Sequence, residues 1–303
     1  MHEYWRGGVE AWECDEMGHM NVRFWSRRAM DALGWLERQL GLPADLRLVL
    51  RDQHIKFLKE AAAGTPLYGV GGVTEVLADG LRVYLEIRHS RDGAVGATFI
   101  NELACVRRRS LEPQPLPEAV AEAARLCLVA LPGHALPRSV PVDRPLRRGS
   151  LALAEAAGFT RVGLSMVRAS DLDGEGLFQA EGFIGRVSEG VPTLMAGWRE
   201  EAAEEASALD GVERRAGAAV LEYRLSFLAW PGAGDMVAVS SGVVAVADKT
   251  MTLNHWLLDP VSGAPWCVAE AVAITFDLNA RKAIATPPRA RAALEAMLVR
   301  LDP

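Results

Sequence analysis

The feature that most constrains the fold of this chain is a repeat of its own pattern. A shift of 170 residues places Asp52–Leu58 on Glu222–Leu228, and it places the turn-like Asp92-Gly93-Ala94 on Ser262-Gly263-Ala264. Upstream, a shift of 158 residues aligns Val9, Asp15, Gly18 and Arg28 with Val167, Asp173, Gly176 and Arg186. The two halves are therefore predicted to fold alike, each as one unit of about 150 residues.

The two shifts differ, which locates a length difference between the copies. The second copy must be longer between its central helix and its second strand, because the shift changes from 158 to 170 in that interval. The charged, alanine-rich segment Glu200–Gly217 is predicted to hold the insertion.

Within the first copy the hydrophobic pattern predicts a strand, a helix, four further strands and a final helix. The expected segments are Tyr4–Val9 (strand), Asn21–Leu40 (helix), Leu46–Leu58, Leu67–Leu77, Leu81–His89 and Ala94–Val106 (strands), and Glu118–Leu128 (helix). Gly41-Leu42-Pro43 ends the long helix. Runs of strands around one helix indicate the α+β class.

The proline-rich stretch Leu131–Pro145 is the natural connection between the copies. We assign residues 1–130 to a first domain, 131–150 to the linker and 151–303 to a second domain. A small sheet wrapped on one helix leaves an edge strand exposed, and pairing of the two halves edge to edge would protect such edges.

Composition limits the classes of function. Half of the 303 residues are hydrophobic, and the net charge of −6 with a pI near 5.6 argues against nucleic acid as a partner. The start of the chain does not resemble a secretion leader, and no apolar run reaches the ~18 residues of a membrane span. We expect a soluble, cytoplasmic protein without membrane attachment.

Several common catalytic arrangements lack their motif here. The four cysteines have no CxxC spacing and are expected to be reduced thiols, and the six histidines show no HxxxH or HExxH spacing, so no metal is expected. The chain contains neither a GxSxG elbow nor a GxxxxGK[ST] loop. No cofactor is implied.

A candidate site lies between the first strand and the long helix. Seven residues, Asp15 to Asn21, contain a carboxylate, a flexible glycine at position 18, the His19 imidazole and the Asn21 amide. A helix N-terminus offers unpaired N–H groups and a positive dipole end, which suit a developing oxyanion. In the alternative interpretation, Asp15 only forms a turn and Asn21 only caps the helix.

On these residues the chain resembles the hotdog-fold acyl thioesterases of the 4-hydroxybenzoyl-CoA thioesterase-like branch. That family carries Asp-x-x-Gly-His-x-Asn between its first strand and its central helix, and Asp15, Gly18, His19 and Asn21 match it at the same spacing. The resemblance implies a tandem, or double, hotdog fold, with a long helix wrapped by a curved antiparallel sheet in each half. It also implies hydrolysis of an acyl-CoA thioester.

The resemblance assigns roles to individual residues. Asp15 would attack the thioester or activate water, and the mechanism stays open between nucleophile and general base. His19 and Asn21 would orient the reacting groups. Gly18, Val22 and Trp25 would contact the substrate, with backbone N–H groups near Asn21 and Val22 holding the oxyanion.

Three further points stay open at this stage. Glu13 and Glu16 flank Asp15 and are alternative acids. Met17 stands where related acyl-carrier-protein thioesterases have an asparagine, which favours coenzyme A thioesters. The rival functions are a non-catalytic acyl-thioester-binding protein and a hotdog hydratase or dehydratase, and the fused halves could assemble further into a homo-oligomer.

The second copy departs from the motif. Asp173 and Gly176 remain, but Leu177 replaces the histidine and Gln179 replaces the asparagine. We therefore predict one competent site and one degenerate site, with Glu175 as the acid that could rescue the second.

Overall fold

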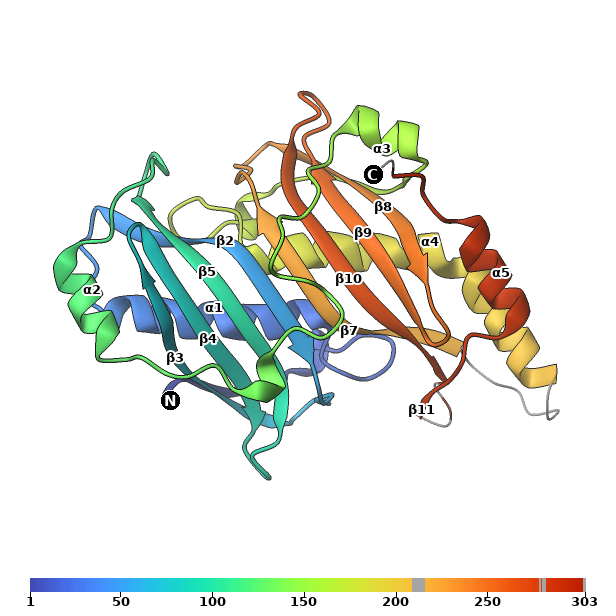
Figure 1. Ribbon diagram of the computed structural model, residues 1–303, viewed down its shortest axis with the longest axis horizontal. Helices are drawn as coiled ribbons and strands as arrows, with labels where there is room; N and C mark the ends of the chain where they lie inside the picture. The colour runs from blue at the N-terminus through green and yellow to red at the C-terminus, as the bar shows by residue number, and fades with distance from the viewer. Residues whose placement is uncertain (209–215, 278, 280–281, 302–303) are drawn as a thin grey trace. The chain divides into compact units, whose positions relative to one another are not determined.

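The computed structural model describes residues 1–208, 216–277, 279 and 282–301, and it divides into two compact units, Met1–Arg138 and Ser139–Pro303. The division falls inside the proline-rich segment that we assigned to the linker. Each unit contains one long helix and one antiparallel sheet (Figure 1).

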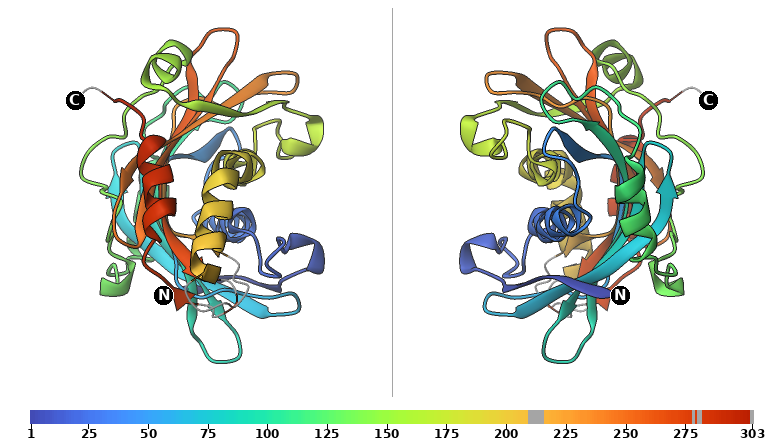
Figure 2. Two further views of the ribbon diagram at one scale, coloured as in Figure 1. Left: turned by 90° about the vertical axis from the view of Figure 1, so that its right-hand side faces the viewer. Right: turned by 90° about the vertical axis from the view of Figure 1, so that its left-hand side faces the viewer.

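The first unit has the predicted order of elements. They are β1 (His2–Gly8), α1 (Val22–Gln39), β2 (Leu46–Phe57), β3 (Pro66–Leu77), β4 (Gly80–His89), β5 (Val95–Arg107) and α2 (Glu118–Arg125), with short 3₁₀ helices at Ala11–Glu13 and Gly133–Ala135. The strands lie in the order β1-β3-β4-β5-β2, all antiparallel. The right-hand view of Figure 2 shows this sheet curving around α1.

The long helix α1 forms because one of its faces is apolar. Trp25, Ala29, Leu33 and Leu36 recur at helical spacing and are all buried. Asn21 caps the start of the helix, and Gly41, with φ of +68°, follows its end. Burial of each large apolar side chain stabilises the unit by roughly 1.5–3 kcal/mol, which holds α1 against the sheet.

The second unit repeats this plan with additions. Its elements are α3 (Leu151–Ala157), β6 (Thr160–Met166), α4 (Ala180–Ala208), β7 (Ala216–Phe227), β8 (Met236–Val246), β9 (Thr250–Leu258), β10 (Pro265–Asp277), β11 (Lys282–Ala283) and α5 (Pro288–Ala296), with a 3₁₀ helix at Ala169–Asp171. The sheet order is β7-β10-β9-β8-β6, and β11 pairs with β10. The sequence analysis did not predict α3 or β11.

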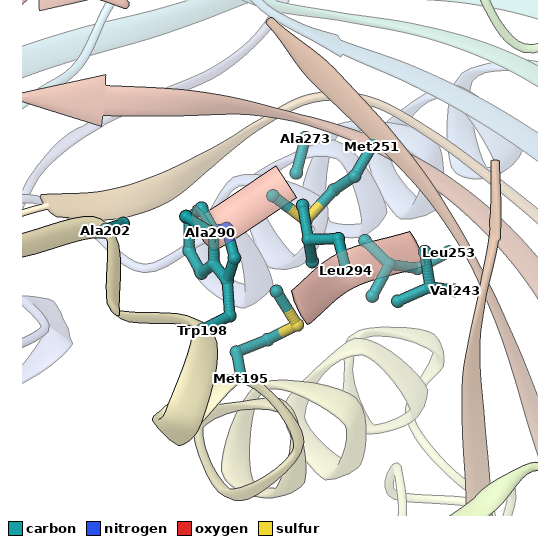
Figure 3. Packing of buried hydrophobic residues seen from close by; sticks show 9 residues of the cluster. All are labelled: Met195, Trp198, Ala202, Val243, Met251, Leu253, Ala273, Ala290 and Leu294. Carbon is teal, nitrogen blue, oxygen red and sulfur yellow. The ribbon is translucent and has the colours of Figure 1, made fainter. Parts of the chain in front are cut away.

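The length difference between the copies lies partly in the central helix. α4 has 29 residues against 18 in α1, and it packs against α5. This contact is filled by an apolar cluster from α4, α5 and the sheet (Figure 3), whose buried members are Met195, Trp198, Ala202, Val243, Met251, Leu253, Ala273, Ala290 and Leu294. Of the predicted insertion, Glu200–Gly217, residues 209–215 lie outside the described part of the chain.

Candidate functional site

The chain enters α1 through a small hairpin formed by residues 13–21. The Asn21 N–H donates to the Glu13 carbonyl at 3.0 Å, and the Asp15 N–H donates to the His19 carbonyl at 2.9 Å. The Gly18 N–H closes the turn on the Asp15 carbonyl, and Gly18 itself has φ of +76°, which other residues adopt at a cost. Asp15 and His19 therefore face each other across the closed end of the hairpin.

The Asp15 carboxylate is exposed and only partly used. Its Oδ1 accepts the Met17 N–H at 2.9 Å, an Asx turn, so the turn-forming role is real. No other described residue hydrogen-bonds this carboxylate. One oxygen remains accessible to water or to a ligand.

The capping of α1 leaves one backbone donor without a partner. The Asn21 side chain accepts the Arg23 N–H at 3.0 Å, and the Asn21 carbonyl accepts the Phe24 N–H at 2.9 Å. Among the described residues, none accepts the Val22 N–H. Of the two candidate oxyanion donors, the Asn21 N–H is already bonded to the Glu13 carbonyl. The Val22 N–H, at the positive end of the helix dipole, is therefore the remaining candidate.

His19 lies beside a residue that the sequence analysis did not select. Its Nε2 is 3.5 Å from Glu60 Oε2, in the loop between β2 and β3. That loop is held to the hairpin because the Met20 N–H donates to the Ala61 carbonyl at 2.8 Å. Glu60 is separated from His19 by a strand and a helix, so no local pattern signals their proximity.

The structure removes one of the two alternative acids. Glu13 is 1 % exposed, and both of its carboxylate oxygens accept from Arg28 Nη2, at 2.5 and 2.6 Å. The same guanidinium group donates to the Gly8 carbonyl at 3.3 Å, and Glu13 also accepts the Glu10 N–H. Glu13 is thus an internal anchor of the loop. The sequence signal that could have pointed to this ion pair is the arginine shared by both copies, Arg28 and Arg186.

The residues assigned to substrate contact occupy different environments. Gly18 is exposed at the turn, and Val22 is half-buried at the first position of α1. Trp25 is 3 % exposed, and its ring fills the space over Gly96, where a Cβ would lie 2.3 Å from it. Trp25 is therefore a core residue, and its role in substrate binding stays a prediction.

A buried polar chain behind the hairpin was missed by the sequence analysis. The Ser26 hydroxyl donates to Gln53 Oε1 at 3.0 Å, and Gln53 Nε2 donates to Asn101 Oδ1 at 2.8 Å. All three residues are fully buried, and Asn101 continues the chain to the Val83 carbonyl. These bonds join the start of α1 to three strands of the first unit.

The second unit repeats the hairpin bond for bond. The Asp173 N–H donates to the Leu177 carbonyl at 2.7 Å, Gly176 has φ of +84°, and the Gln179 N–H donates to the Asp171 carbonyl at 3.0 Å. Arg186 Nη2 binds Asp171 at 2.8 Å, as Arg28 binds Glu13. The side chains of the motif differ, however. Asp173 Oδ1 accepts two N–H groups, from Glu175 and Leu177, and the Gln179 amide turns back to the Leu172 carbonyl.

Two other classes of site find no support in the described residues. In that part of the chain, no group of three or more histidine, cysteine or acidic side chains is placed to hold a metal ion. None of its helices is both long and apolar enough to cross a bilayer.

Comparison with known proteins places the chain in a family. The model of the thioesterase-like superfamily matches residues 9–124 and 167–294, which is most of the sequence in two tandem segments. The chain belongs to this superfamily. Its membership confirms the predicted resemblance and supports thioester hydrolysis as the general activity. A comparison with curated protein sequences finds no match.

Solved structures of similar fold cover nearly the whole chain. A provisionally assigned oleoyl thioesterase from Lactobacillus plantarum has a TM-score of 0.66 at 13% identity, covering 90% of this chain and 96% of that one. An acyl-ACP thioesterase from Bacteroides thetaiotaomicron has a TM-score of 0.64 at 11% identity, with coverages of 89% and 96%. The 12:0-ACP thioesterase from Umbellularia californica has a TM-score of 0.62 at 11% identity, with coverages of 89% and 93%. The predicted tandem hotdog fold is confirmed.

Proposed function

We propose that this protein hydrolyses an acyl-CoA thioester at the hairpin of its first unit, with Asp15 as the reacting carboxylate. The observation that carries the proposal is that this region contains both an available carboxylate oxygen and an available N–H donor. Asp15 has an accessible oxygen on the hairpin, and Val22, where the hairpin enters α1, has an N–H without an acceptor among the described residues.

Two reaction paths use these groups. As a nucleophile, an Asp15 oxygen attacks the thioester carbon, the C–S bond breaks to release the thiolate, which takes up a proton, and water then hydrolyses the resulting anhydride. As a general base, Asp15 takes a proton from water while the hydroxide attacks the same carbon, and that proton goes to the departing sulfur. In both paths the Val22 N–H stabilises the negative charge on the carbonyl oxygen.

The remaining residues of the motif position these groups. Asn21 fixes the first turn of α1 by capping it, and therefore fixes the direction of the Val22 N–H. His19, held near Glu60 across the hairpin from Asp15, is proposed to orient the water or the thioester. Gly18 leaves the turn without a side chain, and Trp25 would support the substrate surface from beneath.

The choice of coenzyme A over acyl-carrier protein rests on Met17. Its thioether accepts hydrogen bonds only weakly and cannot donate one, so it cannot take the part of an amide at this position. The acyl-ACP thioesterases of similar fold are 11% identical to this chain, and that likeness concerns the fold alone.

The experiment is release of free thiol, followed with a chromogenic thiol reagent, from matched acyl-CoA and acyl-ACP panels. The partly exposed thiols of Cys14 and Cys127 can also react with the reagent, so a blank without substrate is subtracted. We expect release from acyl-CoA. Release from acyl-ACP alone would overturn the coenzyme A assignment. Tight binding without release would favour the non-catalytic binding protein, and addition of water across an enoyl-CoA would favour the hydratase.

A further inference from the structure

The second unit contains a cavity of about 240 Å³ on the face of its sheet that residues 139–147 cross. Figure 1 shows this segment in front of β10, with α4 behind the sheet. Asn254 and Glu270 line the sheet side of the cavity, together with the apolar Trp256 and Val268. Leu146 contributes from the covering segment.

The covering segment is held in place by specific contacts. The Glu222 carboxylate accepts the N–H groups of Ser139 and Val140, at 2.6 and 2.8 Å. Arg224 Nη1 donates to the carbonyls of Pro141 and Arg144, both at 2.6 Å. Leu146 packs in one apolar cluster with Trp256 and Val268. The cavity is therefore covered on one side by a segment of chain that these contacts hold in place.

Two acceptor groups in the cavity lack partners. Asn254 and Glu270 are directly paired across β9 and β10, so their side chains lie next to each other. Asn254 Oδ1 is buried and accepts no hydrogen bond in the described part of the chain. The half-buried Glu270 carboxylate has no hydrogen bond to any described residue either, and its burial raises its pKa, opposed by Arg144 and Arg224. Buried polar oxygens are normally satisfied, so Asn254 Oδ1 calls for a donor. A donor at this position would also reach the neighbouring Glu270 carboxylate.

At the equivalent positions of the first unit, the polar side chain already has a hydrogen-bond partner. The shift of 170 residues puts Tyr84 and Ile100 where the second unit has Asn254 and Glu270. The buried Tyr84 hydroxyl donates to Glu86 at 2.6 Å, and Glu86 also lies 2.9 Å from His134 Nε2. The partnerless oxygens are thus a feature of the second unit and not of the shared fold.

The charges around the cavity specify a complementary ligand. An ammonium group has three N–H donors and suits the adjacent oxygens of Asn254 and Glu270. Arg144 and Arg147, both exposed, line the same cavity and suit a carboxylate. A plain amine would leave the Arg144 guanidinium group without a carboxylate, and a plain fatty acid would leave the oxygens of Asn254 and Glu270 without a donor.

We infer that this cavity binds a free α-amino acid with an apolar side chain. Its ammonium group donates to Asn254 and Glu270, its carboxylate meets Arg144, and its side chain packs on Leu146. The inference does not depend on the proposed thioesterase activity, since every contact in it belongs to the second unit.

The test is isothermal titration of the whole protein with L-leucine, beside two analogues of the same size. 3-Methylbutylamine lacks the carboxylate, and 4-methylpentanoate lacks the ammonium group. We expect leucine to bind, with each analogue weaker by about 10-fold or more, as expected for loss of a charged hydrogen bond. Absence of heat with leucine, methionine and phenylalanine at millimolar concentration would overturn the inference, and so would equal binding of the amine.

A variant ties the binding to this cavity. Glu270→Gln keeps the shape of the side chain and should lower leucine affinity about 10-fold or more. Glu295→Gln, which changes a surface carboxylate paired with Arg291 on α5, is the matched control and should bind leucine normally. The melting temperature checks that both variants remain folded. Unchanged affinity in folded Glu270→Gln would overturn the assignment.

Discussion

The hairpins at residues 13–21 and 171–179 have the same backbone and different chemistry. Each ends in a glycine-containing turn, and each is held to its helix by an acid–arginine pair. In the first, Asp15 has an unused oxygen and faces His19. In the second, Asp173 is tied down by two backbone N–H groups, and a leucine replaces the imidazole.

This difference separates what the fold needs from what a site needs. A strand must turn sharply to become the central helix, and both copies keep the glycine and the ion pair that make the turn. The buried chain of polar side chains, by contrast, differs between the two copies. Ser26, Gln53 and Asn101 correspond in the second unit to Ile184, Tyr223 and Ala271. The buried chain of side-chain hydrogen bonds behind the start of the helix is therefore specific to the first unit, where the proposed reaction takes place.

The largest expected effect concerns the two anchoring ion pairs. Glu13→Gln removes the charge that balances the buried Arg28 and should lower the free energy of unfolding by about 3–5 kcal/mol. The equivalent change, Asp171→Asn, should cost less because the side chains of Asp171 and Arg186 are 22% and 16% exposed. Urea unfolding of the two variants measures the difference. An equal loss in both would mean that burial does not set the strength of these pairs.

The next effect tests the asymmetry of the sites directly. Asp15→Asn should reduce turnover on the order of 10²-fold or more, with folding intact, because a reacting carboxylate is removed. Asp173→Asn should leave turnover nearly unchanged. Both variants and the double variant are assayed on one substrate. If Asp173→Asn halves the rate or more, and only the double variant is dead, both sites work and the comparison fails.

A third prediction contrasts the polar and apolar versions of the buried layer. Gln53→Leu leaves Ser26 and Asn101 without their shared partner and should destabilise the protein by about 1–3 kcal/mol. The matched change is Tyr223→Phe. The buried Tyr223 hydroxyl has no partner among the described residues, so its removal should be neutral or stabilising. Thermal unfolding compares them, and destabilisation by Tyr223→Phe would show that its hydroxyl is bonded in solution.

The smallest expected effect is at the helix caps. Asn21→Ala removes the acceptor for the Arg23 N–H and should cost about 1 kcal/mol. Turnover should fall as well, because the direction of the Val22 N–H then varies. Gln179→Ala, which only breaks a bond to the Leu172 carbonyl, should change stability less and turnover little. Loss of turnover in Gln179→Ala equal to that in Asn21→Ala would argue that the second hairpin takes part in catalysis.

The sequence by itself determined the order of elements in the first unit, and it pointed to the segment before α1 as the candidate site. The apolar face of α1, the turn at Gly18 and the cap at Asn21 depend on residues within a few positions of one another, so their spacing is legible without a structure. The repeat then extended the predicted order of strands and helix to the second unit. α3, at Leu151–Ala157, begins directly after the assigned linker, where the sequence analysis placed no element, because its pattern is only seven residues long.

The tertiary structure alone decided which of the neighbouring acids is available. Glu13 and Asp15 are two residues apart and look equivalent in sequence. Glu13, however, is buried and paired with Arg28 of α1, whereas Asp15 is exposed to solvent. Burial against Gly96 places Trp25 in the core by the same kind of long-range contact. The charge and exposure of a side chain depend on what packs around it. Those neighbours come from distant segments, which local spacing does not encode.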